Sequence, residues 1–193
     1  MVRVSNREKI LKKGLEVVHR RGFANASVRD IVAAAGVPQG SFTNNFESKE
    51  AFGLEILEIY FARAIALMNE TLRNESLPPL QRLRVWIDRS TETAQKDGMR
   101  NGCMLGNFTA EACDASEAVR RRLNAMFAQL RAGIAHCLRA AVAAGELPKD
   151  FDCEDAAGFI QTSMQGAVLL AKAERSTAPV ARFKKMLFEK VLH

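Results

Sequence analysis

The chain has 193 residues, of which 48% are hydrophobic, and a formal net charge of +6. This composition supports a sizeable core, and single Tyr and Trp residues with five prolines favour helices over strands. The polar N-terminal segment and the lack of a long apolar run argue against a secretory leader and a membrane span. Four cysteines without CxxC spacing argue against a zinc site and a disulfide framework, so we expect a cytoplasmic protein without metal or cofactor.

A capping box at Ser5 and Glu8 predicts a first helix that continues to about Arg21 and ends at Gly22. The apolar residues of this segment recur at helical spacing and predict one buried face. They are Ile10, Leu11, Leu15 and Val18.

The run from 27 to 52 predicts two short helices around a glycine turn and a third that follows at once. Ser27 and Asp30 form a second capping box, and Gly36 stands where the first helix must end. Ser48 suits the cap of the third helix. The intervening short helix presents small hydrogen-bonding side chains, which suit base edges and phosphates better than a core. Its expected outward positions are Gln39, Ser41, Thr43, Asn44 and Asn45.

Periodicity extends the helix capped by Ser48 to about residue 73 and predicts five further helices, which makes the chain all-α with about nine helices. The further helices are expected at 80–96, 103–113, 116–144, 152–175 and after Pro179. We expect a helix-turn-helix domain at 1–50 and a second helical domain at 51–193. Cys137 and Met186 fall on apolar stripes, whereas Cys153 and the run Arg120 to Arg122 are expected to face solvent.

Residues 1–50 hold nine Lys or Arg against five Asp or Glu, a balance that suits phosphate neutralisation. The run from 27 to 52 resembles the DNA-binding domain of the TetR family of transcriptional repressors, through Gly36, Val37, Gly40, Phe46 and the triplet at 48–50. This resemblance implies a repressor that binds a double-stranded operator, and no catalytic residues. The residues expected at the DNA are Ser27, Arg29, Gln39, Ser41, Thr43, Asn44, Asn45 and Lys49.

A helix-turn-helix contacts few base pairs, so binding to a palindromic operator calls for two copies. The resemblance implies a homodimer through the helices near 153–175 and 179–192. Gly158 and Gly166 would permit close helix approach there, although ordinary packing within one chain also explains them.

The segment 101–123 resembles one branch of the family, that of the N-ethylmaleimide reductase repressor, whose members respond to electrophiles or oxidants. The branch implies a reactive cysteine at Cys103, a second at Cys113 and a partner lysine at Lys172. Cys103 precedes a predicted helix, where the helix dipole favours a thiolate. A buried packing role for Cys103 and a solvated Lys172 remain the alternatives.

A non-covalent small-molecule inducer in an apolar pocket is the competing hypothesis. Its expected lining residues are Met68, Trp86, Met104, Asn107, Phe108, Glu111, Phe127 and Gln165, all of which also suit a core or a solvated face. A helical adaptor is a remoter alternative, since it leaves the polar short helix unexplained. An enzyme is not supported, because the sequence shows no phosphate-binding loop and no metal-ligand constellation.

Overall fold

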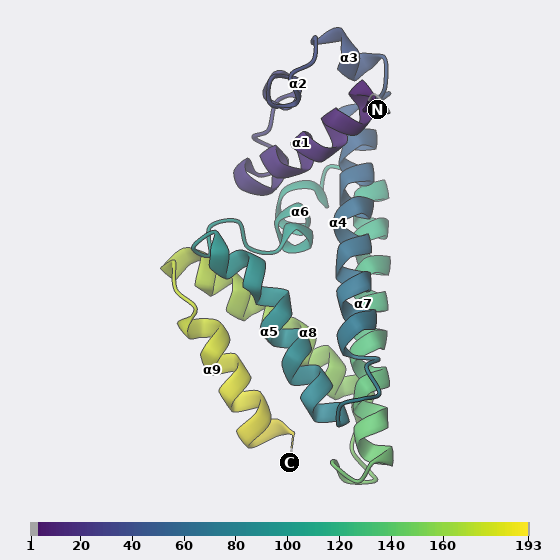
Figure 1. The fold of residues 1–193 in the computed structure, drawn as a ribbon, viewed down its shortest axis with the longest axis vertical. Helices are drawn as coiled ribbons and strands as arrows, with labels where there is room; N and C mark the ends of the chain where they lie inside the picture. The colour runs from purple at the N-terminus through teal and green to yellow at the C-terminus, as the bar shows by residue number, and fades with distance from the viewer. Residues whose placement is uncertain (1–3, 193) are drawn as a thin grey trace. The chain divides into compact units, whose positions relative to one another are not determined.

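The computed structural model describes residues 4–192, which form an all-α chain with nine α-helices (Figure 1). The all-α prediction is therefore confirmed. No helix in this range has the length and apolar character that crossing a membrane requires. The helices are α1 Asn6–Arg21, α2 Val28–Ala35, α3 Gly40–Thr43, α4 Lys49–Thr71, α5 Pro79–Lys96, α6 Met104–Ala112, α7 Glu117–Ala143, α8 Cys153–Glu174 and α9 Ala178–Met186, followed by a π-helical turn, Leu187–Val191.

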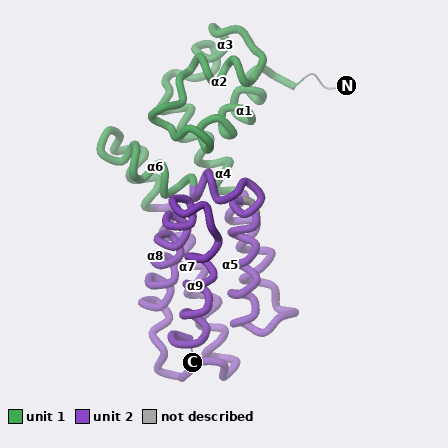
Figure 2. Tube along the Cα trace, turned by 90° about the vertical axis from the view of Figure 1, so that its left-hand side faces the viewer, with its two compact units in different colours: residues 1–62, 104–124 green, residues 63–103, 125–193 purple. Residues whose placement is uncertain are grey.

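The chain divides into two compact units (Figure 2). Unit 1 comprises residues 1–62 and 104–124, and unit 2 comprises residues 63–103 and 125–193. This division differs from the boundary expected at residue 50. The first half of α4, all of α6 and the start of α7 belong to unit 1. Phe52 of α4 packs on Phe42, Phe108 of α6 stacks on Phe23, and Arg122 of α7 pairs with Glu58 of α4, which are contacts that periodicity alone does not predict.

The predicted helix caps are present. In α1 and α2 the box is reciprocal: Ser27 Oγ accepts from the Asp30 amide at 3.1 Å, while the Asp30 carboxylate accepts from the Ser27 amide at 3.1 Å. Ser48, Ser116 and Asp152 cap α4, α7 and α8 through their side-chain oxygens. These hydrogen bonds satisfy amides that a helix start leaves unpaired.

Three phenylalanine rings form the centre of unit 1. Phe42 of α3, Phe46 of the following turn and Phe52 of α4 lie with ring centroids 5.1 to 5.4 Å apart. All three are buried, and Phe52 is fully enclosed. Gly14 of α1 completes the packing, because a Cβ there would lie 2.5 Å from the Phe52 ring and 3.0 Å from Ile31.

Unit 2 has one large apolar core and a smaller one. The large core joins α5, α7, α8 and the terminal π-turn through residues such as Leu83, Ile134, Ile160 and Leu187. The smaller core joins Met99 to α8 and α9. Cys137 is 1% exposed within the large core, which confirms its predicted packing role, and burial raises the pKa of its thiol to about 11.

Two predictions of side-chain exposure in unit 2 are wrong. Cys153 is 9% exposed rather than solvent-facing, because the first turn of α8 directs it into the large core. Met186 is 51% exposed rather than buried. Val180 and Leu187 occupy the buried side of the last helix, and Met186 lies about 120° around the axis from Val180.

We predict that Gly14→Ala lowers the free energy of unfolding by about 1–3 kcal/mol, since overpacking forces enclosed side chains off their preferred positions. Phe52 cannot yield, because Phe42 and Phe46 hold its ring. Urea unfolding followed by circular dichroism measures the change. Gly40→Ala is the control, since a Cβ at Gly40 meets nothing within 4 Å. Equal stability of the two variants would contradict the prediction.

Candidate functional site

The helix α3 is four residues long and follows the turn at Gly36, which has the left-handed φ of 64° that favours glycine. Gln39, Thr43 and Asn44 are exposed at this helix. The Thr43 hydroxyl donates to the Gly40 carbonyl at 3.1 Å, which fixes its rotamer. Three polar side chains therefore stand on the surface of α3 as the sequence predicts.

Ser41 and Asn45 do not point outward, contrary to expectation. Ser41 is 9% exposed, and its hydroxyl accepts a hydrogen bond from Asn6 Nδ2 of α1 at 3.3 Å. Asn45 is half-buried and donates to the Ser41 carbonyl at 2.6 Å. Ser41 thus joins α3 to α1, whereas Asn45 bonds to the backbone of α3 itself. Both face inward because the buried Phe42 and Phe46 bring this side of the helix onto the core. Nothing in the sequence pattern pairs Asn6 with Ser41.

Two further expected DNA contacts differ in their surroundings. Ser27 is exposed, and its hydroxyl caps α2 by accepting from the Asp30 amide. The same hydroxyl donates to the Asp30 carboxylate at 2.6 Å, and this second hydrogen bond is the leading cause of a lowered pKa of Asp30. Arg29 is exposed on the first turn of α2. The neighbouring Arg21 forms an ion pair with Asp30 at 2.7 Å.

Lys49 lies against the α1–α2 loop, which we define as residues 22–26. Its ammonium donates to the Ala24 carbonyl at 3.2 Å and stands 4.8 Å from the centre of the Phe23 ring. Burial lowers the pKa of Lys49, while the negative charge of Glu111 acts in the opposite direction. The Lys49 ammonium is thus engaged inside unit 1.

Glu111 of α6, which was expected to line a pocket or face solvent, is half-buried in unit 1. Its carboxylate accepts a hydrogen bond from the Ala24 amide at 2.9 Å. The Phe108 ring, one turn earlier on α6, stacks on Phe23 with centroids 4.7 Å apart. Met104 and Phe108 are each 1% exposed, so both act as core residues, and Asn107 is half-buried.

Cys103 directly precedes α6 and is half-buried. Gln165 of α8 donates a hydrogen bond from Nε2 to Cys103 Sγ at 3.5 Å, so the structure joins two residues that the sequence assigned to different roles. Cys113, directly after α6, and Lys172 of α8 are also half-buried.

The remaining expected pocket residues belong to unit 2. Met68 and Trp86 are buried in the large core, and the Met68 sulfur packs so closely on α7 that a Cβ at Gly133 would lie 2.1 Å from it. Phe127 is half-buried, and its carbonyl accepts from Gln161. A hollow on the surface of unit 2 is lined by residues outside the expected pocket set. They are Arg139, Val142, Lys149, Phe151, Asp152, Cys153 and Glu154.

Comparison with known proteins gives two family matches. Residues 10–56 match the model described as bacterial regulatory proteins of the tetR family, and residues 79–187 match the tetracyclin repressor-like C-terminal domain. The chain belongs to the TetR family of transcriptional regulators. These regulators are DNA-binding helix-turn-helix proteins rather than enzymes.

Three other TetR-family proteins are similar to this chain in sequence or in structure. The repressor DhaR of Mycobacterium sp. (strain GP1) is 37% identical over 192 residues, which are 100% of this chain and 95% of DhaR. The repressor NemR of Escherichia coli (strain K12) is 30% identical over 118 residues, 61% of this chain and 59% of NemR. A crystal structure of E. coli NemR in the reduced form matches with a TM-score of 0.85 at 26% identity, covering 94% of each chain. That of the regulatory protein TetR from Rhodobacter sphaeroides has a TM-score of 0.89 at 31% identity, covering 94% of this chain and 96% of that one. DhaR thus matches at higher identity and over more of the chain than NemR.

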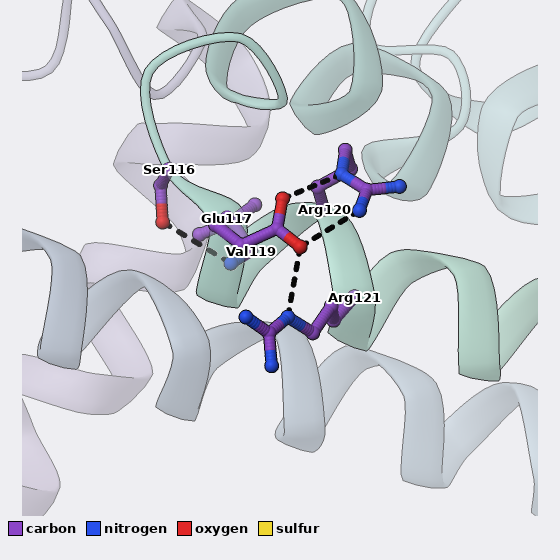
Figure 3. A network of polar contacts seen from close by, with 5 residues as sticks. All are labelled: Ser116, Glu117, Val119, Arg120 and Arg121. Carbon is purple, nitrogen blue, oxygen red and sulfur yellow. Dashed lines mark hydrogen bonds and ion pairs between the residues drawn. The ribbon is translucent and has the colours of Figure 1, made fainter.

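In this TetR-family chain an ion-pair network begins α7 (Figure 3). Glu117 accepts from Arg120 and Arg121 at 2.7 and 2.8 Å, and the hydrogen bond from Arg120 is the leading cause of a Glu117 pKa of about 2. Arg120 and Arg121 are exposed as predicted. Arg122 is not, because it pairs with Glu58 of α4 and lies 5.7 Å from the Phe61 ring centre.

Proposed function

We propose that this TetR-family regulator represses transcription by binding a palindromic operator as a homodimer, with Gln39, Thr43 and Asn44 of α3 at the base edges and phosphates. The exposure of these three polar side chains on a helix that the aromatic core holds in place carries the proposal. Ser41 and Asn45 serve the same helix from its inner side, through their hydrogen bonds to Asn6 and to the backbone. Arg29 supplies positive charge at the start of α2.

Exposed apolar side chains on α8 and α9 support a dimer. Phe159, Leu169 and Leu170 of α8 are 50%, 66% and 52% exposed, and Met186 of α9 is 51% exposed. Within residues 4–192, the only other exposed large hydrophobic residue is Val4. An apolar surface gathered on two packed helices favours association with a second copy, since burial removes it from water.

We predict that the double variant Leu169→Glu and Met186→Glu is monomeric, because two carboxylates cannot be desolvated in an apolar interface without partners. Light scattering coupled to size-exclusion chromatography measures the mass. The control is Glu189→Gln, an exposed position on the terminal turn. A double variant that elutes as a dimer would place the interface elsewhere.

We predict that Gln39→Ala and Asn44→Ala each weaken binding to the operator by about 1–3 kcal/mol and relax base preference, as loss of a direct base contact does. Fluorescence anisotropy measures affinity, using the duplex that the wild-type protein selects from random sequence. Gln129→Ala, at an exposed position on α7, is the matched control. Wild-type affinity that does not fall with rising salt would argue against operator binding, since phosphate contacts release counterions.

For the inducer, we propose modification of Cys103 by an electrophile or oxidant, as the resemblance to the NemR branch suggests. Cys103 directly precedes α6, is half-buried, and its sulfur receives the Gln165 hydrogen bond. Cys137 and Cys153, by contrast, are buried in unit 2. Lys172 and Cys113 are proposed as further sensor residues on the same resemblance. The alternative is a non-covalent inducer held by apolar side chains and by a polar group such as Gln165.

We predict that N-ethylmaleimide releases the wild-type protein from its operator and that Cys103→Ser abolishes this response. The Cys103 thiolate adds to the maleimide double bond, forming a C–S bond, and the adjacent carbon takes up a proton. Anisotropy before and after treatment measures release, and mass spectrometry locates the adduct. Cys153→Ser, which removes a buried thiol without a proposed sensor role, is the control and is expected to retain release. Unchanged release in Cys103→Ser would favour the non-covalent inducer.

A further inference from the structure

The α1–α2 loop of unit 1 is attached to α6 by a set of contacts that the helix-turn-helix does not require. The Glu111 carboxylate accepts a hydrogen bond from the Ala24 amide at 2.9 Å, and the Phe108 ring stacks on the Phe23 ring with centroids 4.7 Å apart. Both α6 residues lie on one face, three positions apart, so they meet consecutive residues of the loop.

Two glycines allow this approach. A Cβ at Gly22 would lie 2.7 and 2.8 Å from the two carboxylate oxygens of Glu111, and Gly22 has a φ of 87°, which other residues rarely adopt. A Cβ at Gly53 of α4 would lie 2.7 Å from the Phe23 ring. The loop is therefore enclosed between α4 and α6 at distances that only glycine permits.

Lys49 of α4 completes the arrangement. Its ammonium donates to the Ala24 carbonyl at 3.2 Å, while Glu111 accepts from the amide of the same residue. Both backbone groups of Ala24 are thus held by charged side chains from two different helices. Charge-assisted hydrogen bonds are stronger and more directional than neutral ones, so they fix the loop in one position.

We propose that Glu111, together with Phe108, is a positioning residue for operator binding. Glu111 holds the α1–α2 loop, and therefore the orientation of α2 and α3, in the arrangement that binds DNA. The proposal rests on the operator binding proposed above. Residue Ala24 is exposed, so breaking its contact with Glu111 costs little global stability. Such a contact can change between two states while the Phe42, Phe46 and Phe52 core stays intact.

The test compares Glu111→Ala with Glu111→Gln and with Glu92→Ala, which removes an exposed carboxylate on α5. We expect Glu111→Ala to weaken operator affinity about 3- to 10-fold, the loss that one partly exposed hydrogen bond produces. Glu111→Gln keeps an acceptor oxygen for the Ala24 amide and is expected to restore most of the affinity. Glu92→Ala is expected to bind as the wild type does.

A merely structural role would not produce this pattern, and two further measurements separate the roles. We expect the melting temperature of Glu111→Ala to stay within about 4 °C of wild type, while the Ala24 amide exchanges with solvent deuterium faster. Wild-type affinity in Glu111→Ala, or equal losses in the Ala and Gln variants, would overturn the proposal. A wild-type protein that binds no duplex specifically would instead overturn the operator function on which the proposal rests.

Discussion

A helix of four residues cannot hold its own conformation, and α3 is such a helix. Nucleation of a helical turn is unfavourable, and no side chain caps α3 at Gln39. Its orientation depends on Phe42, which packs on Phe52 with ring centroids 5.4 Å apart. This packing requirement determines which side chains of α3 are exposed. Residues that face Phe52 or α1 serve packing, whereas the polar side chains of Gln39, Thr43 and Asn44 stay exposed.

Helix α4 provides the contacts that position both α3 and α6. Phe52 packs with the α3 rings, and the next residue, Gly53, lies beneath Phe23 and close to Phe108 of α6. Gly14 brings α1 onto Phe52 from another side. Side chains at successive helical positions point about 100° apart, so α4 can contact α3 and the α1–α2 loop at one level along its axis. This explains why α6 clusters with the helix-turn-helix in unit 1 rather than with the helices that precede it in the chain.

What the sequence could predict was local. Capping boxes, glycine turns and apolar periodicity act within a few residues, and they located the nine helices and the burial of residues such as Cys137. The errors concern partners far away in the chain. Ser41 is buried because Asn6 reaches it across 35 positions, and Glu111 meets Ala24 across 87. A polar residue on a short helix looks exposed until the opposing helix is known.

The two candidate sensor cysteines lie at opposite ends of α6: Cys103 directly precedes this helix and Cys113 directly follows it. Met104, joined to Cys103 by one peptide bond, donates from its amide to the Tyr60 hydroxyl of α4 at 3.5 Å. The Tyr60 ring in turn stands edge-on to His19 of α1 at 5.6 Å. Met104 therefore contacts α4 directly and α1 through the Tyr60 ring. Phe108 and Glu111 belong to the same nine-residue helix, so the residues that contact the α1–α2 loop lie between the two cysteines in the chain. Under the sensing proposed at Cys103, one short helix is therefore the covalent path from the modified residue to the contacts that hold the α1–α2 loop.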